Sequence, residues 1–204
     1  MPENMRAIGR IVSVQVQPAS LKYKHDGVGY YDPTPLLVVQ SLRLSSKGVI
    51  GVTADARSIM DIHHVEHPQS GNSRGANGVS IGFTSHYQAM RARFGERLVN
   101  GCAGENILVE TDSIMTLADL ESAVAIQAAA SGQLAYLTRL KVAAPCVEFS
   151  HFAANAGTPL PAAKLQDTLQ FLHNGLRGFY ATLTGEQGEV SVRAGDRVFV
   201  VEDA

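Results

Sequence analysis

Short segments in which apolar and polar residues alternate constrain the fold of this 204-residue chain more than any other feature of its sequence. The alternation is strictest over residues 134–142 and is also present over 12–16, where every second residue is valine. A period of two residues is typical of a strand that buries one face. Other apolar segments, bounded mainly by turn-forming residues, predict strands at 36–44, 107–109, 179–183, 190–192 and 197–201. We therefore predict a mainly β fold with a few helices, in which the strands close into a barrel and leave no exposed sheet edge.

The segment from residue 117 to residue 142 admits two interpretations. Its alanine-rich first half, 117–130, has good helix propensity, and Thr116 followed by Asp119 resembles a helix-capping pair. Against that, residues 124–128 and 134–142 both alternate, and the Ser-Gly pair at 131–132 between them is typical of a hairpin turn. We predict a β-hairpin here and keep the helix, which would give an α+β fold, as the alternative.

Helices are predicted in two other segments. Residues 84–94 begin with hydroxyl side chains that can cap a helix and are followed by Gly95, and residues 161–172 begin with a proline and carry leucines about one turn apart. Residues 54–78 contain three glycines, one proline and three histidines but few large apolar groups, which predicts a long loop. Because the chain shows no internal repeat and no low-complexity linker, we expect residues 1–204 to form a single domain.

Composition excludes several classes of protein. The chain has 17 basic and 19 acidic residues and no basic block, which argues against a nucleic-acid partner. Its longest uncharged stretch, 122–138, is shorter than the about 20 apolar residues that cross a bilayer, so no membrane association is expected. Two cysteines cannot form a disulfide framework, and the first ten residues do not resemble a signal peptide. These features predict a cytoplasmic protein.

The strongest candidate for a reactive group is Cys146. It comes directly after the alternating segment, and Pro145 cannot donate a ladder hydrogen bond, so the thiol is expected at the end of a strand and at the mouth of the barrel. Arg139, Lys141 and Arg177 are cations that can favour the thiolate, the form that attacks electrophiles or binds soft metals. The alternative is an inert, buried thiol, which is the usual state of a free cysteine.

A second candidate site lies in the predicted loop. His63, His64 and His67 are interspersed with carboxylates, and imidazole with carboxylate suits zinc or iron. This pattern predicts a metal-dependent hydrolase as an alternative function, although a solvated, histidine-rich loop fits it as well. The same loop can contact phosphate, with Arg57 and Arg74 as further donors.

Common nucleotide and catalytic motifs are missing from the sequence. The glycines around Cys102 are not followed by the Gly-Lys-Ser/Thr of a phosphate-binding loop, and no G-x-G-x-x-G motif opens a helix. No G-x-S-x-G elbow with a plausible order of serine, histidine and aspartate stands out. The two cysteines are too far apart in sequence for a zinc ribbon or a thioredoxin-like pair. We expect Cys102 to be structural.

Four segments, taken in order, resemble the MOSC domain family, the modules found at the C-terminus of molybdenum cofactor sulfurases and as stand-alone bacterial proteins. They are Gly-Glu-Asn-Ile at 104–107, Pro-Cys at 145–146, Leu-Arg-Gly-Phe-Tyr-Ala at 176–181 and Ala-Gly-Asp-Arg-Val at 194–198. The resemblance extends over about residues 6–201, nearly the whole chain, and favours a stand-alone member.

The resemblance implies a β-barrel and a cysteine, matched by Cys146, that carries sulfur as a persulfide or binds molybdenum. It places Glu105 and Asn106 beside the same cleft. Residues 51–55, which end at Asp55, are similar to a family turn, with Ala54 in place of a second glycine. The basic residues that the family usually has before Pro-Cys are replaced here by two alanines.

The resemblance also implies the molybdenum cofactor, molybdopterin, as the ligand. Its pterin and phosphate need donors, for which the candidates are Asn106, Arg57, Arg74, Arg177 and His67. The implied activities are sulfur transfer and reduction of N-hydroxylated compounds, so the protein would be a sulfurtransferase or a molybdenum-dependent oxidoreductase. A sulfur-donor or electron-donor protein would be its partner. Descriptions of the family also mention pyridoxal phosphate, a cofactor of the separate desulfurase domain. A non-catalytic binding module is the remaining alternative.

Overall fold

A closed barrel of seven strands forms the centre of the computed structural model, which describes residues 4–72, 76–120, 122–156, 159–184 and 188–202. In the order in which they pair, its strands are β14 (Arg197–Val201), β10 (Ala123–Gln127), β11 (Leu134–Val142), β12 (Phe179–Leu183), β8 (Val79–Phe83), β9 (Ile107–Glu110) and β1 (Met5–Val16). Pairing of β14 with β1 closes the barrel. Neighbouring strands are antiparallel except β8 and β9, which are parallel. The predicted β-barrel is therefore confirmed.

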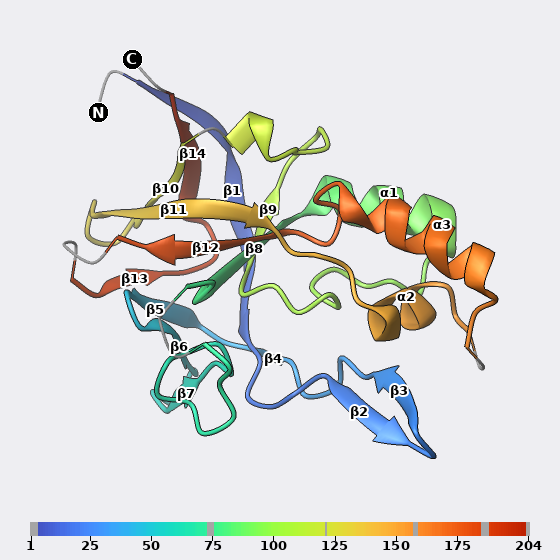
Figure 1. Cartoon of the computed structure of the whole chain (residues 1–204). Helices are drawn as coiled ribbons and strands as arrows, with labels where there is room; N and C mark the ends of the chain where they lie inside the picture. Colours follow the sequence, from blue (N-terminus) through green and yellow to red (C-terminus); the bar gives the residue numbers. More distant parts are fainter. Residues whose placement is uncertain (1–3, 73–75, 121, 157–158, 185–187, 203–204) are drawn as a thin grey trace.

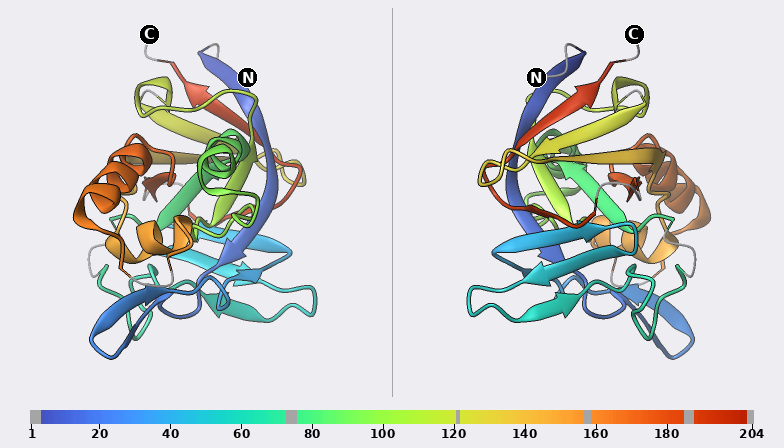
Figure 2. Two further views of the ribbon diagram at one scale, coloured as in Figure 1. Left: turned by 90° about the vertical axis from the view of Figure 1, so that its right-hand side faces the viewer. Right: turned by 90° about the vertical axis from the view of Figure 1, so that its left-hand side faces the viewer.

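Smaller sheets extend the barrel at the end away from the chain termini (Figures 1 and 2). One sheet consists of β13 (Val190–Val192), β5 (Ser41–Ser45), β6 (Gly48–Val52) and β7 (Ser58–Met60). A separate hairpin consists of β2 (Lys22–His25) and β3 (Val28–Tyr31), and β4 (Leu37–Val38) pairs with the end of β1.

Helices cover one side of the barrel, and both views in Figure 2 place them there. They are α1 (Thr84–Phe94), α2 (Val147–Ala153) and α3 (Ala162–His173). Their apolar faces form a second core with Tyr31 of β3, and Tyr87, Phe149 and Leu172 are fully buried in it. A short 3₁₀ turn at Ala118–Leu120 instead packs against β14 and buries Leu120 in the barrel core. Among the described residues, no helix combines the length and the apolar character that a membrane span requires.

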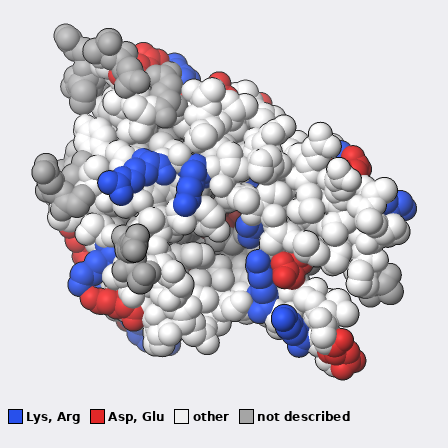
Figure 3. All heavy atoms as spheres, viewed as in Figure 1, with Lys and Arg blue, Asp and Glu red and all other residues white. Residues whose placement is uncertain are grey.

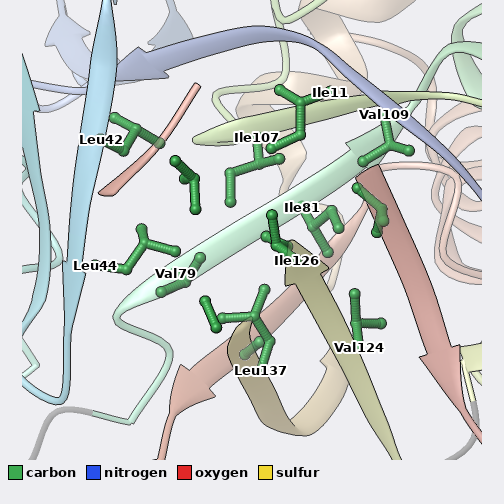
Figure 4. Packing of buried hydrophobic residues seen from close by; sticks show 14 of the residues in the cluster. Ile11, Leu42, Leu44, Val79, Ile81, Ile107, Val109, Val124, Ile126 and Leu137 are labelled. Atoms are coloured by element: carbon green, nitrogen blue, oxygen red, sulfur yellow. The ribbon is translucent and has the colours of Figure 1, made fainter. Parts of the chain in front are cut away.

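The barrel interior is filled by every second residue of its strands (Figure 4). Val79 and Ile81 on β8, and Ile107 and Val109 on β9, are completely buried in one cluster. Burying a side chain of this size stabilises the fold by about 1.5–3 kcal/mol. Apolar residues alternate with others along these strands because successive side chains point into the barrel and away from it.

The hairpin predicted around residues 131–132 is confirmed, and the alternative helix over 117–130 does not form. β10 and β11 pair in continuous register, and Gly132 takes a positive φ of 73° in the turn. Cross-strand burial therefore prevails over the helix propensity of the alanines. The helices predicted at 84–94 and 161–172 are also confirmed.

Two predictions of local structure are wrong. The single strand expected at 36–44 is divided into β4 and β5, because the chain passes there from the barrel to the second sheet: the Val39 N–H bonds to Val14 and the Gln40 N–H bonds to Val52. The loop expected at 54–78 contains β7, which pairs with β6. A third element, α2, was not predicted from the sequence.

Candidate functional site

A cavity of about 340 Å³ opens between one end of the barrel, the start of α2 and the β2–β3 hairpin. Figure 3 shows this face hollowed near its centre, with lysine and arginine side chains at the border. The volume lies within the range of roughly 300–1,000 Å³ that is typical of small-molecule sites. Residues far apart in the sequence line it, among them Lys22, His63, Glu105, Cys146 and Arg177.

Cys146 lies in this cavity at the beginning of α2, four residues after β11 ends. Its sulfur accepts the N–H of Phe149 at 3.4 Å, so the thiol caps the helix. The main-chain oxygen of Cys146 accepts both the N–H and the hydroxyl of Ser150, at 3.0 and 2.9 Å. These contacts fix the direction of the half-buried thiol.

Arg177 joins the two loops on either side of the cavity. Its guanidinium donates to the carbonyl of Ala144, beside Cys146, at 3.3 Å and to the carbonyl of Ala103, beside Glu105, at 3.4 Å. It also lies over the Phe149 ring, 5.2 Å from the centroid. No ion pair between described residues involves Arg177, so its charge is available to a ligand.

The local electrostatics keep Arg177 charged. Burial acts to lower the pKa of this guanidinium, but the phenols of Tyr180 and Tyr31 and the neighbouring thiol raise it above its ordinary value overall. Cys146 is one of those neighbours, so a fixed cation faces the thiol. Of the three cations predicted to act on it, Arg177 lines the cavity, whereas Arg139 and Lys141 do not.

Glu105 lies at the floor of the cavity and is 4% exposed. Burial raises the pKa of its carboxyl group, although a hydrogen bond with Tyr87 and the charge of Arg177 act in the opposite direction. Its Oε2 atom has no partner among the described residues.

Asn106 faces away from the cavity. Its Oδ1 accepts the N–H and the hydroxyl of Ser80, at 3.0 and 2.9 Å, and its Nδ2 donates to Asp61 at 2.8 Å. Nδ2 also donates to the main-chain oxygen of Gln15. With its amide engaged in this way, Asn106 positions other residues rather than contacting a ligand in the cavity.

Asp61 orients His63 toward the cavity. The Asp61 carboxylate is completely buried, and its Oδ1 contacts both the N–H and the ring Nδ1 of His63 at 2.9 Å. Its Oδ2 accepts from the N–H of Gln17 and from Asn106, both at 2.8 Å. His63 lines the cavity, and its Nε2 is the ring nitrogen left for a ligand.

The structure does not bring the three histidines together. His64 is buried, its Nδ1 accepts the N–H of Glu66, and burial lowers its pKa. The His67 Nε2 lies 3.1 Å from the oxygen of Pro18. Among the described residues, no group of three or more histidine, cysteine, aspartate or glutamate side chains is arranged to hold a metal ion.

Asp55, Arg57 and Arg74 were also predicted to bind the ligand. Asp55 and Arg57 form an exposed ion pair of 2.7 Å in the turn between β6 and β7, and neither lines the cavity. Arg74 lies outside the described residues. Cys102 is buried in the second core, and burial raises its pKa to about 12, as expected of a structural thiol.

Several residues of the cavity were not identified from the sequence. Lys22 and Tyr31 reach it from the β2–β3 hairpin, and Lys22 pairs with Glu148 of α2 at 3.5 Å. No motif connects that hairpin with Cys146, because only the folded chain brings them together.

Comparisons with known proteins show to which family the chain belongs. A family model described as the MOSC domain matches residues 75–199. No match was found among curated proteins. The solved structure of the YUAD protein from Bacillus subtilis has a TM-score of 0.55 at 12% identity, covering 98% of this chain and 97% of that chain.

Two further solved structures are similar. A hypothetical protein has a TM-score of 0.54 at 14% identity, with 97% of this chain and 70% of that chain covered. YiiM from Geobacillus stearothermophilus has a TM-score of 0.47 at 14% identity, with 97% and 75% covered. At these identities, the likeness to YUAD and to the hypothetical protein concerns the fold alone.

Proposed function

This chain belongs to the MOSC domain family, which is associated with molybdenum cofactor binding and sulfur-related functions, and from that premise we propose that it binds the molybdenum cofactor through Cys146 and reduces N-hydroxylated compounds. The observation that carries the proposal is one cavity that contains a thiol with a fixed direction, a buried carboxyl group and a guanidinium that forms no ion pair with any described residue. Molybdenum held by a dithiolene is soft and takes a thiolate ligand.

The residues of the cavity fit such a group. Cys146 supplies the soft donor, and Arg177 and Lys22 supply positive charge for a phosphate. Gln17 adds an amide at the same wall. The cofactor, when bound, supplies two-electron chemistry, and the protein supplies binding and orientation.

The groups around the thiol favour reduction over sulfur carriage. Reduction of an N–OH group to N–H and water consumes two protons, and the cavity holds two groups that can handle protons, Glu105 and the Asp61-oriented His63. Carriage of a persulfide requires only the thiol. The electrons would come from a second protein, since the chain contains no flavin or iron–sulfur motif.

Elemental analysis by mass spectrometry tests the proposal. The wild type, Cys146→Ala and the matched control Cys102→Ala are produced in a host that makes molybdenum cofactor. We expect molybdenum in the wild type and the control and none in Cys146→Ala, because Cys102 is buried in the second core.

Three results would contradict the proposal. Molybdenum at the wild-type level in Cys146→Ala would show that the thiol is not the ligand. Zinc in all three proteins would favour a hydrolase on the histidine loop. No metal in the wild type would leave sulfur carriage, detected as sulfane sulfur on Cys146, or a binding module with an inert thiol.

A further inference from the structure

Glu105 is a buried acid without a compensating partner for one of its oxygens. It lines the cavity from the loop directly before β9, and only 4% of the residue is exposed. Oε2 has no hydrogen-bond partner among the described residues. A buried carboxylate oxygen left without a donor is costly, whereas a buried carboxylic acid carries no charge to compensate.

The fold makes space for this carboxyl group at Oε1. A Cβ atom added at Gly82 would lie 2.5 Å from Oε1, so β8 has a glycine where the carboxyl group packs. The Tyr87 hydroxyl accepts the N–H of Ala103 at 3.0 Å and hydrogen bonds to Glu105. The carboxyl group is thus fixed by packing at Oε1, and its buried Oε2 has no hydrogen-bond partner among the described residues.

We propose that Glu105 is kept as a neutral carboxylic acid beside the cavity, and that its carboxyl group donates a hydrogen bond, and then its proton, to the oxygen of the N–OH group that is reduced. The proposal rests on the proposed function and assigns it a proton donor. It also defines the ligand class, since a neutral acid selects a hydrogen-bond acceptor at this position and not a cation.

The charges that face Glu105 are consistent with a neutral acid. The ionisable groups that interact with it from the packed elements are Tyr87 of α1, Tyr31 of β3, and Cys102 and Arg177 of the flanking loops. The two tyrosines and Cys102 are neutral, because burial raises the pKa of each. Arg177 is the one cation of this set, and burial of the carboxyl group outweighs its effect.

The step balances as follows. Reduction of R=N–OH to R=NH and water breaks the N–O bond and takes up two electrons and two protons. When bound, the molybdenum cofactor would supply both electrons, and an electron-donor protein would be the reductant that restores them. One proton passes from the Glu105 carboxyl group to the leaving hydroxyl, and the second reaches the nitrogen from solvent. Glu105 then recovers its proton from solvent through the cavity mouth.

Infrared spectroscopy tests the protonation state without relying on activity. At neutral pH, the wild type should show a protonated-carboxyl band that Glu105→Gln lacks. The matched control is Glu110→Gln, an exposed acid on the same strand, and it should retain the band. Acetamidoxime, the probe for an N–OH ligand, should shift the band in the wild type because it accepts the hydrogen bond.

Kinetics of the molybdenum-loaded protein complete the test. Glu105→Gln is expected to retain molybdenum and fold but to lose about 10²-fold or more in kcat, as is typical when a general acid is removed. The absence of the carboxyl band, a band that acetamidoxime does not shift, or a wild-type kcat in Glu105→Gln would each overturn the proposal. Absence of molybdenum from the wild type would instead refute the proposed function, and the infrared result would still decide whether Glu105 is a neutral donor.

Discussion

Replacing Asn106 with alanine should strongly destabilise the protein, because its amide joins three elements inside the fold. It accepts two hydrogen bonds from Ser80 of β8 and donates to the Asp61 carboxylate in the loop after β7. All three residues are buried, so water cannot replace what is lost.

The magnitude follows from the groups that would lose a partner. An orphaned buried N–H costs about 1–3 kcal/mol, and loss of a hydrogen bond to a charged group costs about 1.5–3 kcal/mol. Asn106→Ala leaves the Ser80 N–H without its amide acceptor and the Asp61 carboxylate with one fewer donor. We expect the free energy of unfolding to fall by about 3–5 kcal/mol.

Urea denaturation of the wild type, Asn106→Ala and Asn100→Ala measures this loss. Asn100 is exposed, and its side chain accepts one bond, from Arg91, so its replacement should cost less than about 0.5 kcal/mol. A loss below about 1 kcal/mol in Asn106→Ala would refute the reasoning, since it would mean that the buried network adjusts without its central amide. Because Asp61 orients His63, the variant should also bind molybdenum cofactor more weakly while the reactivity of the Cys146 thiol is unchanged.

Two further predictions concern the backbone beside Arg177 and a buried histidine. Gly178 has a φ of +100°, and an added Cβ would lie 2.6 Å from the oxygen of Ile81, so Gly178→Ala should lower both Tm and molybdenum content. The control Gly132→Ala, at φ +73° with open space around it, should lower Tm only slightly. Burial lowers the pKa of His86 from 6.5 to about 4, so the unfolded state binds the extra proton first and stability is lost as the pH falls from 6.5 to 4. Urea denaturation of the wild type and His86→Gln over that range should show this loss as a pH-dependent difference of about 3 kcal/mol in the free energy of unfolding, which separates it from the opposite contribution of Glu105. A difference that does not change with pH would contradict it.

Residues close in the sequence could be assigned to the right elements from local patterns. The alternation over 134–142 correctly predicted a strand, but the buried face in its first half carries Ala135 and Leu137, and an irregularity at Arg139 turns Leu140 and Val142 toward the core only in the second half. α2 was not predicted, because it is only seven residues long and its first turn depends on the Cys146 sulfur as a cap. The strand predicted at 36–44 was too long, because apolar composition does not show where a chain passes from one sheet to another.

The candidate site was predictable only in part, for a related physical reason. Cys146, Glu105 and Arg177 were selected from motifs, and the structure places all three at one cavity. The partnership between Asp61 and Asn106 crosses from a loop to a strand, and no periodicity in the sequence indicates such a pair. The histidines were interpreted as possible ligands of one metal because they are close in sequence, but their side chains have separate partners.

The adjacent pair Glu105 and Asn106 shows how the fold gives two neighbouring polar residues different functions. The two residues directly precede β9, and their side chains enter different surroundings. Glu105 lines the cavity, while Asn106 enters the buried network that fixes Asp61 and, through it, His63, which lines the same cavity. The register of β9 against β8 places Asn106 beside Ser80, so a one-residue shift of β9 would break the hydrogen bonds between them and move the acid out of its place at the cavity.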